Sequence, residues 1–303
     1  WLKPFWLKLS QRFDGRSPRR PAGTSALARV TPREGGGAMG WLSWSYEWDP
    51  RSLRLFRAIL GFRMAFEAFD AALHRAVFLS DGGIVPRADI VNEPESEHAA
   101  LNVYLAAGGR VVWLLLACHA ACAACVALGV RMPWSLAAGY FFQCSLIDRW
   151  GDLRIGGLDY ANKTLLFWSL AVPLTEDSPM PRGNLHLIPL HLTVLYGVTG
   201  WLKTGWEWAE GSAVYIVLGS SISRGNLLDD ALRGSPTLCH VLTRGALLLE
   251  RFGWLALWVP LPAVRALAVG AFAGLHIGIH LTCDVGDFHM VMLGPLIALL
   301  PTS

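Results

Sequence analysis

The sequence predicts an all-α polytopic membrane protein with about eight transmembrane helices and a polar-lined bundle interior. Hydrophobic residues make up 53% of the 303 residues, and the mean hydropathy is +0.39. Only 16% of the residues are charged, against about 25% in soluble domains. The hydrophobic residues gather in runs close to the roughly 20 residues that a helix needs to cross the hydrocarbon of a bilayer.

Residues 1–40 are expected to form a basic tail that precedes a transmembrane domain at residues 41–303. Eleven of the 26 Lys and Arg residues lie in the first 57 positions, and residues 16–40 are rich in Pro, Gly, Arg and Ser. Such a composition does not bury a core of its own. We expect the tail to dock on other membrane protein subunits.

Eight apolar runs follow the tail, at residues 53–79, 111–130, 133–148, 155–174, 185–203, 239–260, 263–282 and 287–301. Basic residues favour the cytoplasmic side, and an even number of spans returns the chain to its starting side. Both termini are therefore expected on the cytoplasmic side, or on the stromal or matrix side of an organelle. The acidic connection 80–110 and Lys203 are expected on the opposite face. Residues 205–238 are too broken to span and are expected at the lipid interface or in a re-entrant excursion.

The first run carries a polar stripe. Arg63, Glu67, Asp70 and His74 recur at spacings of four, three and four, which places them on one side of a helix. Charged groups in hydrocarbon are costly unless they are partnered. We expect this polar bundle stripe to turn inward, either as an ion-pair network that fixes helix packing or as a catalytic group.

Histidines in the apolar runs raise the question of a metal site. His119 lies in mid-run and is either hydrogen-bonded core or a ligand. His276 and His280 stand four residues apart in HIGIH, so they could face one metal or tetrapyrrole. A dinuclear metal site needs further histidine boxes or spaced carboxylates, so we predict no metal and no haem or chlorophyll. The sequence also lacks a P-loop, a dinucleotide fingerprint and a nucleic-acid-binding surface.

Lys203 ends the fifth run and is the most prominent candidate residue. Glu207 and Glu210 follow it, interleaved with Trp206 and Trp208. An ionisable cluster at the edge of a membrane segment indicates a functional site. Tryptophans and a lysine at a helix end are also typical of an interfacial anchor. Both interpretations stay open on the pattern alone.

Five stretches in order resemble a known family: RSLRLFRAILGFRMAFEAFD, SDGGIVPR, GGLDYANKTLLFWSLAVPL, GVTGWLKTGWEWAEGSAVY and LHIGIHLTCDVGDFHMVMLGPLIALLP. From about Ser52 to Pro301 the chain resembles the horizontally transferred transmembrane domain family. This is the membrane module shared with the vitamin K-dependent γ-carboxylases.

The resemblance implies a role for Lys203. In the carboxylases the corresponding lysine is the base that deprotonates vitamin K hydroquinone. Oxygenation then yields a strong base that removes a glutamate γ-proton before CO2 adds. Lys203 occupies that position in GWLKTGWEWAEG, and Glu210 matches as well. A quinone or vitamin K-like ring would then be the cofactor.

Two departures separate this chain from the carboxylases. Their supporting Asn-His pair has Asn162 followed by Lys163 as its nearest counterpart, and their large β-rich outer domain is not among these residues. We therefore expect a non-carboxylating structural or accessory subunit of a larger membrane complex, respiratory or photosynthetic. The alternatives are a quinone-dependent carboxylase-like enzyme with Lys203 as its base, or a quinone- or lipid-binding membrane protein.

Overall fold

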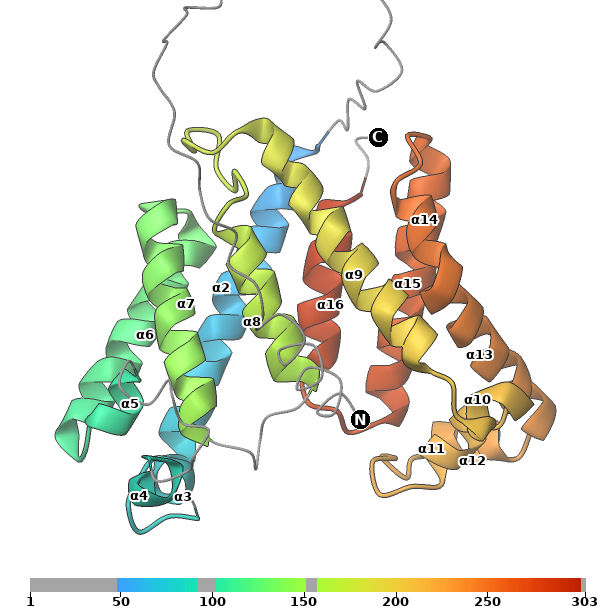
Figure 1. Cartoon of the computed structure of the whole chain (residues 1–303), viewed down its shortest axis with the longest axis horizontal. Coiled ribbons are helices and arrows are strands. Elements are labelled where there is room, and N and C mark those ends of the chain that lie inside the picture. The colour runs from blue at the N-terminus through green and yellow to red at the C-terminus, as the bar shows by residue number, and fades with distance from the viewer. Residues whose placement is uncertain (1–47, 85, 92–101, 151–156, 301–303) are drawn as a thin grey trace, which may run out of the picture. The chain divides into compact units, whose positions relative to one another are not determined.

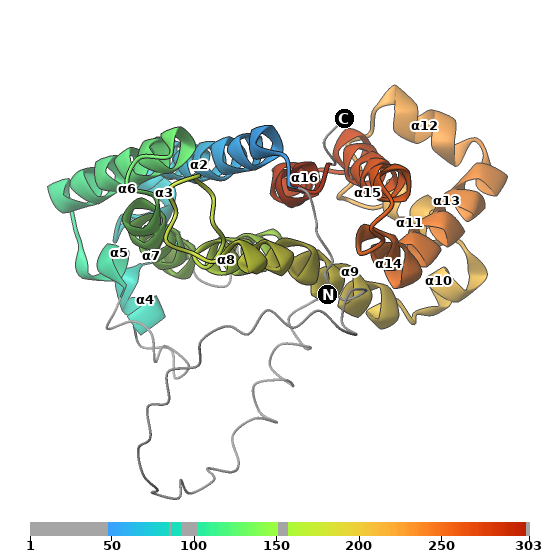
Figure 2. The same cartoon turned by 90° about the horizontal axis from the view of Figure 1, so that it is seen from above.

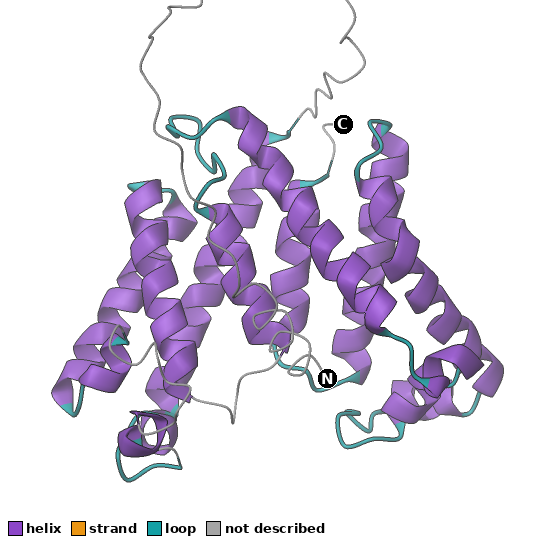
Figure 3. Ribbon diagram, viewed as in Figure 1, coloured by secondary structure: helices purple, strands orange, loops and turns teal. Residues whose placement is uncertain are grey.

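The computed structural model describes residues 48–84, 86–91, 102–150 and 157–300. The predicted tail at residues 1–40 and the middle of the acidic connection lie outside the described residues. Within the described ranges the chain is all-α, as predicted: helices are joined by loops, and no strand longer than a single bridge occurs (Figure 3).

Each predicted apolar run coincides with a helix or with a continuous series of helical segments. These are α2 (Pro50–Leu73), α6 (Arg110–Leu128), α7 (Met132–Trp150), α8 (Gly157–Ser169), η3 with α9 (Arg182–His186, Leu187–Leu202), α13 with η4 and α14 (Pro236–Leu248, Leu249–Gly253, Trp254–Leu257), α15 (Pro262–Thr282) and α16 (Phe288–Ala298). The segment η3 is a 3₁₀ helix, and η4 is a π-helix.

Short helices connect the long ones at one end of the bundle. They are α3 (Arg75–Phe78), α4 (Arg87–Val91), α5 (Val103–Ala106), α10 (Trp206–Glu210), α11 (Ala213–Leu218) and α12 (Leu227–Arg233). Successive long helices run in alternating directions, so that the start of α2 and the end of α16 lie at the other end (Figure 1).

Three helices among the described residues are long and apolar enough to cross a membrane: Arg110–Leu128, Arg182–Leu202 and Pro262–Thr282. The chain is thus a helical protein with three candidate membrane spans. α8 and α16 contain 13 and 11 residues. At 1.5 Å per residue they measure about 20 and 16 Å, which is less than the roughly 30 Å of hydrocarbon in a bilayer.

α2 has its polar residues inside and its aromatic residues outside. Arg63 and Glu67 are 3% and 4% exposed, whereas Phe62, Phe66 and Phe69 are 40 to 60% exposed. A helix in water would bury its phenylalanines and expose its charges. This inverted distribution is what a lipid environment favours.

Small residues let α2 approach α6 closely. A Cβ atom on Gly61 would stand 2.5 Å from the backbone nitrogen of Ala127 and 2.6 Å from the carbonyl oxygen of Ala123. Only glycine fits at that crossing, as in small-residue contacts between membrane helices. α16 packs against both α2 and α15 and lies between them (Figure 2).

Candidate functional site

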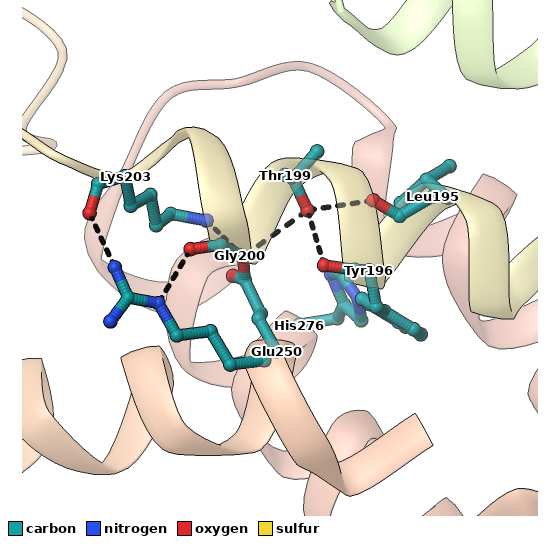
Figure 4. Close-up of polar contacts among 8 residues, drawn as sticks. Leu195, Tyr196, Thr199, Gly200, Lys203, Glu250 and His276 are labelled. Carbon is teal, nitrogen blue, oxygen red and sulfur yellow. Dashed lines mark hydrogen bonds and ion pairs between the residues drawn. The ribbon is translucent and has the colours of Figure 1, made fainter. Parts of the chain in front are cut away.

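One face of α9 carries the polar residues of the candidate site. Tyr196, Thr199 and Lys203 are spaced three and four residues apart, so they lie on one side of the helix. This side faces η4 and α15, while Val194 and Trp201 are exposed elsewhere on α9. We call these three residues with Glu250, Arg251 and His276 the Lys203 cluster (Figure 4).

Lys203 forms an ion pair with Glu250 of η4. Thr199 Oγ1 also donates to Glu250 Oε2, at 3.2 Å. The side chains of Lys203 and Glu250 are 23% and 10% exposed. The ammonium lies 5.2 Å from the ring centre of Trp208, within cation–π range. A carboxylate and an aromatic ring therefore surround the amine.

The partner of Lys203 is neither of the two carboxylates that follow it closely in the sequence, Glu207 and Glu210. Lys203 is the C-cap of α9, and a new helix begins only at Trp206. Glu210 is exposed at the end of that helix. The helix therefore ends between Lys203 and these two carboxylates. Lys203 pairs instead with Glu250, which is 47 positions away in the sequence.

The π-helical turn η4 presents two adjacent charged residues to α9. Arg251 Nε donates to the carbonyl oxygen of Gly200 at 2.9 Å, and Arg251 Nη2 donates to that of Lys203 at 3.0 Å. The last carbonyl groups of a helix lack hydrogen-bond donors within the helix, and Arg251 donates to two carbonyl groups at the end of α9. Such π-turns often mark functional positions.

A buried hydrogen bond joins α9 to α15 one turn before Thr199. The Tyr196 hydroxyl lies 2.7 Å from His276 Nε2. The Tyr196 ring stacks on Phe272 at 3.9 Å between ring centres, and His276 meets Phe288 edge-on at 5.3 Å. The pair is thus a polar contact enclosed by aromatic rings.

The polar stripe of α2 is only partly internal. Arg63 and Glu67 form a buried ion pair, and Arg63 Nη1 stands 3.8 Å from Asp287 Oδ2. Asp70 and His74 pair at 3.0 Å, with 20% of the Asp70 side chain and 51% of the His74 side chain exposed. The expectation that all four residues turn inward is therefore wrong for His74, because α2 ends at Leu73 and His74 caps it.

The remaining candidate residues lie apart from the Lys203 cluster. His119 is buried on α6 with its ring 5.8 Å from that of Phe142, and the rings of His280 and His289 lie 3.7 Å apart at a tilt of 35°. Lys163 pairs with Asp148 of α7. Within the described part of the chain, no group of three or more His, Cys, Asp and Glu residues could hold a metal ion.

Sequence reasoning did not identify the partners of Lys203, although two signals were present. Tyr196, Thr199 and Lys203 follow helical spacing, and Glu250 is the only acidic residue in the run 239–260. A lone acidic residue in an apolar run requires a cation nearby.

No protein-family model, curated protein or solved structure matches the chain.

Proposed function

We propose that this chain is an integral multi-pass membrane protein that resembles the γ-carboxylase membrane module without carboxylating. We further propose that it serves as a structural or accessory subunit of a respiratory or photosynthetic membrane complex. The ion pair between Lys203 and Glu250 carries this proposal. A lysine acts as a base only when its amine can reach the proton it removes, whereas the amine of Lys203 is engaged by Glu250 and lies against the Trp208 ring. Lys203 then ties α9 to η4.

We propose that all eight long helical segments cross or enter the bilayer. Their alternating directions and the outward phenylalanines of α2 support this. α8 and α16 are short for a span, and α16 contacts α2, α8, α9 and α15. Protein on several sides relaxes the demand that a helix match the full bilayer thickness.

The accessory role is tested by gentle isolation from the native membrane and identification of the proteins that migrate with the chain. Lys203→Arg keeps the positive charge and cannot supply a neutral amine at working pH. We expect Lys203→Arg to leave abundance and co-migration unchanged. The alternative is assayed by incorporation of labelled CO2 into glutamate-containing peptides in the presence of vitamin K hydroquinone. Incorporation by the unmodified protein that is lost in Lys203→Arg would identify Lys203 as a base.

Quinone binding is a second candidate, favoured by the Tyr196–His276 pair. A hydroxyl and an imidazole among Phe272 and Phe288 combine the few polar groups and the aromatic lining typical of ring-binding sites. Quinone that co-purifies with the protein, in a smaller amount per protein for the Tyr196→Phe variant, would support quinone binding. Protein purified from its native membrane without a stoichiometric amount of quinone would exclude quinone binding.

A further inference from the structure

Residues 206–233 run across one end of the bundle, and we call them the end segment. Its helices α10, α11 and α12 contain 5, 6 and 7 residues, which at 1.5 Å per residue is at most about 11 Å each. None of these helices is long enough to cross a membrane. Figure 1 shows all three beyond the point where α9 ends.

Large apolar side chains project outward from the end segment. Six of them are exposed: Trp206, Tyr215, Ile216, Ile222, Leu227 and Leu228. Leu227 has 89% of its surface exposed. Six exposed large apolar side chains in so short a segment indicate a surface that meets lipid or a partner.

The bundle holds the end segment in place at several points. The backbone N–H of Val214 donates to Thr243 Oγ1 of α13 at 3.0 Å. Arg224 Nε donates to the carbonyl oxygen of His280 at 2.8 Å, and Asn226 Nδ2 donates to that of Leu281 at 2.7 Å. The apolar side chains are therefore displayed on a fixed scaffold.

The exposed apolar surface continues from the end segment onto the long helices. Leu238, Val241 and Leu242 are exposed on α13, which contacts α10, α11 and α12. Ile277 and Leu281 are exposed on α15, which contacts α12. α15 is one of the three candidate spans, so its exposed face meets acyl chains in the proposed membrane location. The end segment extends that lipid-facing surface.

The charge of the end segment indicates which lipids it meets. It holds four acidic and two basic residues, so it does not attract anionic headgroups. The guanidinium of Arg233 lies 5.6 Å from the ring centre of Tyr215. Tyrosine and arginine with an apolar body and a polar tip are typical of the headgroup level of a bilayer.

We propose that the end segment lies in one leaflet at the boundary between headgroups and acyl chains, with its apolar side chains among the upper acyl carbons of neutral phospholipids. This inference rests on the proposed membrane location of the chain. It gives residues 206–233 a lipid-binding role separate from the helices that span.

The test uses the full chain in phosphatidylcholine nanodiscs that contain a photoactivatable phosphatidylcholine. The diazirine is placed either near the ester or at the acyl terminus, and labelled peptides are identified by mass spectrometry. We expect end-segment peptides to label several-fold more with the shallow probe than with the deep one, at low and at high salt. Peptides from the middle of α6 should favour the deep probe.

Leu227→Asp should reduce shallow labelling of the end segment several-fold, whereas Ser221→Asp, also exposed in this segment, should not. An unlabelled end segment beside a labelled α6 would overturn the inference, since the surface would then face water or a protein. Equal shallow and deep labelling would overturn it in favour of a re-entrant segment. If α6 is also unlabelled, the membrane location itself fails.

Discussion

At the scale of single residues, two ion pairs place charge inside the bundle with a partner of opposite sign. Arg63 and Glu67 lie one turn apart on the same helix, whereas Lys203 and Glu250 come from different helical segments. The first pair could be predicted, because its spacing is visible in the sequence. The second could not be predicted by proximity, since no local pattern brings residues 47 positions apart together.

Glu67→Ala should destabilise the protein by about 3 kcal/mol, because the buried Arg63 side chain then loses its ion-pair partner on α2. Asp70→Ala is the matched control: it removes an i,i+4 pair of the same helix whose histidine is half exposed. Exposed pairs contribute only about 0.2 to 1 kcal/mol. Unfolding in detergent with increasing denaturant measures both changes. Equal losses for the two variants would contradict the buried role of Glu67.

The Lys203–Glu250 pair is tested by a double-mutant cycle. Glu250→Leu leaves the ammonium without its carboxylate and should cost about 3 kcal/mol of stability. Lys203→Met combined with Glu250→Leu should recover most of that loss, because two apolar side chains can replace a buried pair. Additive losses in the double variant would show that the two side chains do not interact.

At the scale of elements, the contact between α9 and η4 depends on Gly200. A Cβ atom there would stand 2.8 Å from the backbone nitrogen of Arg251 and 2.8 Å from the carbonyl carbon of Glu250. Backbone atoms cannot move aside as a flexible side chain can. Gly197, one turn earlier on α9, would place its Cβ atom 3.5 Å from the Trp254 ring nitrogen, an ordinary contact.

Gly200→Ala should therefore destabilise the protein by about 1 to 3 kcal/mol through overpacking. Gly197→Ala should be neutral or stabilising by up to about 1 kcal/mol, because alanine favours a helix over glycine. Thermal unfolding of the two variants in the same detergent compares them. A stable Gly200→Ala protein would mean that α9 and η4 lie farther apart.

The connection between α3 and α4 should loosen in acid. Arg87 Nε donates to Asp81 Oδ1 at 2.6 Å, and this hydrogen bond lowers the pKa of the Asp81 carboxyl below its usual 3.8. A carboxyl whose pKa is lowered by folding stabilises above its unfolded pKa and loses that contribution as the pH falls through its folded pKa. Hydrogen exchange of residues 79–84 and 86–91 should therefore stay constant from pH 7 to 5 after correction for intrinsic rates, and should rise below about pH 4.

Asp81→Asn should show the raised exchange at every pH, because an amide cannot form the ion pair. Asp89→Asn is the control, since Asp89 is exposed on α4. Acid loosening of the same size in Asp81→Asn and in the unmodified protein would assign the transition to another group.

At the scale of the whole molecule, the apolar runs were enough to predict where the long helical segments lie, but not which of them are long and apolar enough to span. α2 is too polar to count as a candidate span, because its helix contains Arg63, Glu67 and Asp70, although the first two are buried as a pair. The run 239–260 is divided by the π-turn η4 into shorter pieces. Hydropathy registers neither the ion pair that accompanies the burial of Arg63 and Glu67 nor the π-turn that divides the run.

The number of spans can be tested by labelling three sites with a membrane-impermeant maleimide in sealed vesicles. Gly82→Cys lies after α2, Gly183→Cys in η3 and Leu261→Cys before α15. Gly82 and Gly183 have open space around a new side chain, and Leu261 is exposed. If all eight helical segments cross, residues 183 and 261 are separated by two crossings, α9 and the series α13, η4 and α14. They then share one side, opposite residue 82.

If only the three candidate spans cross, residues 82 and 261 share a side instead, because only two spans, α6 and α9, lie between them. We expect the first pattern, since α13, η4 and α14 together cover residues 236–257, about 33 Å at 1.5 Å per residue and enough to cross the hydrocarbon. Labelling of residues 82 and 261 from the same side would contradict the eight-span pattern and would agree with the three candidate spans.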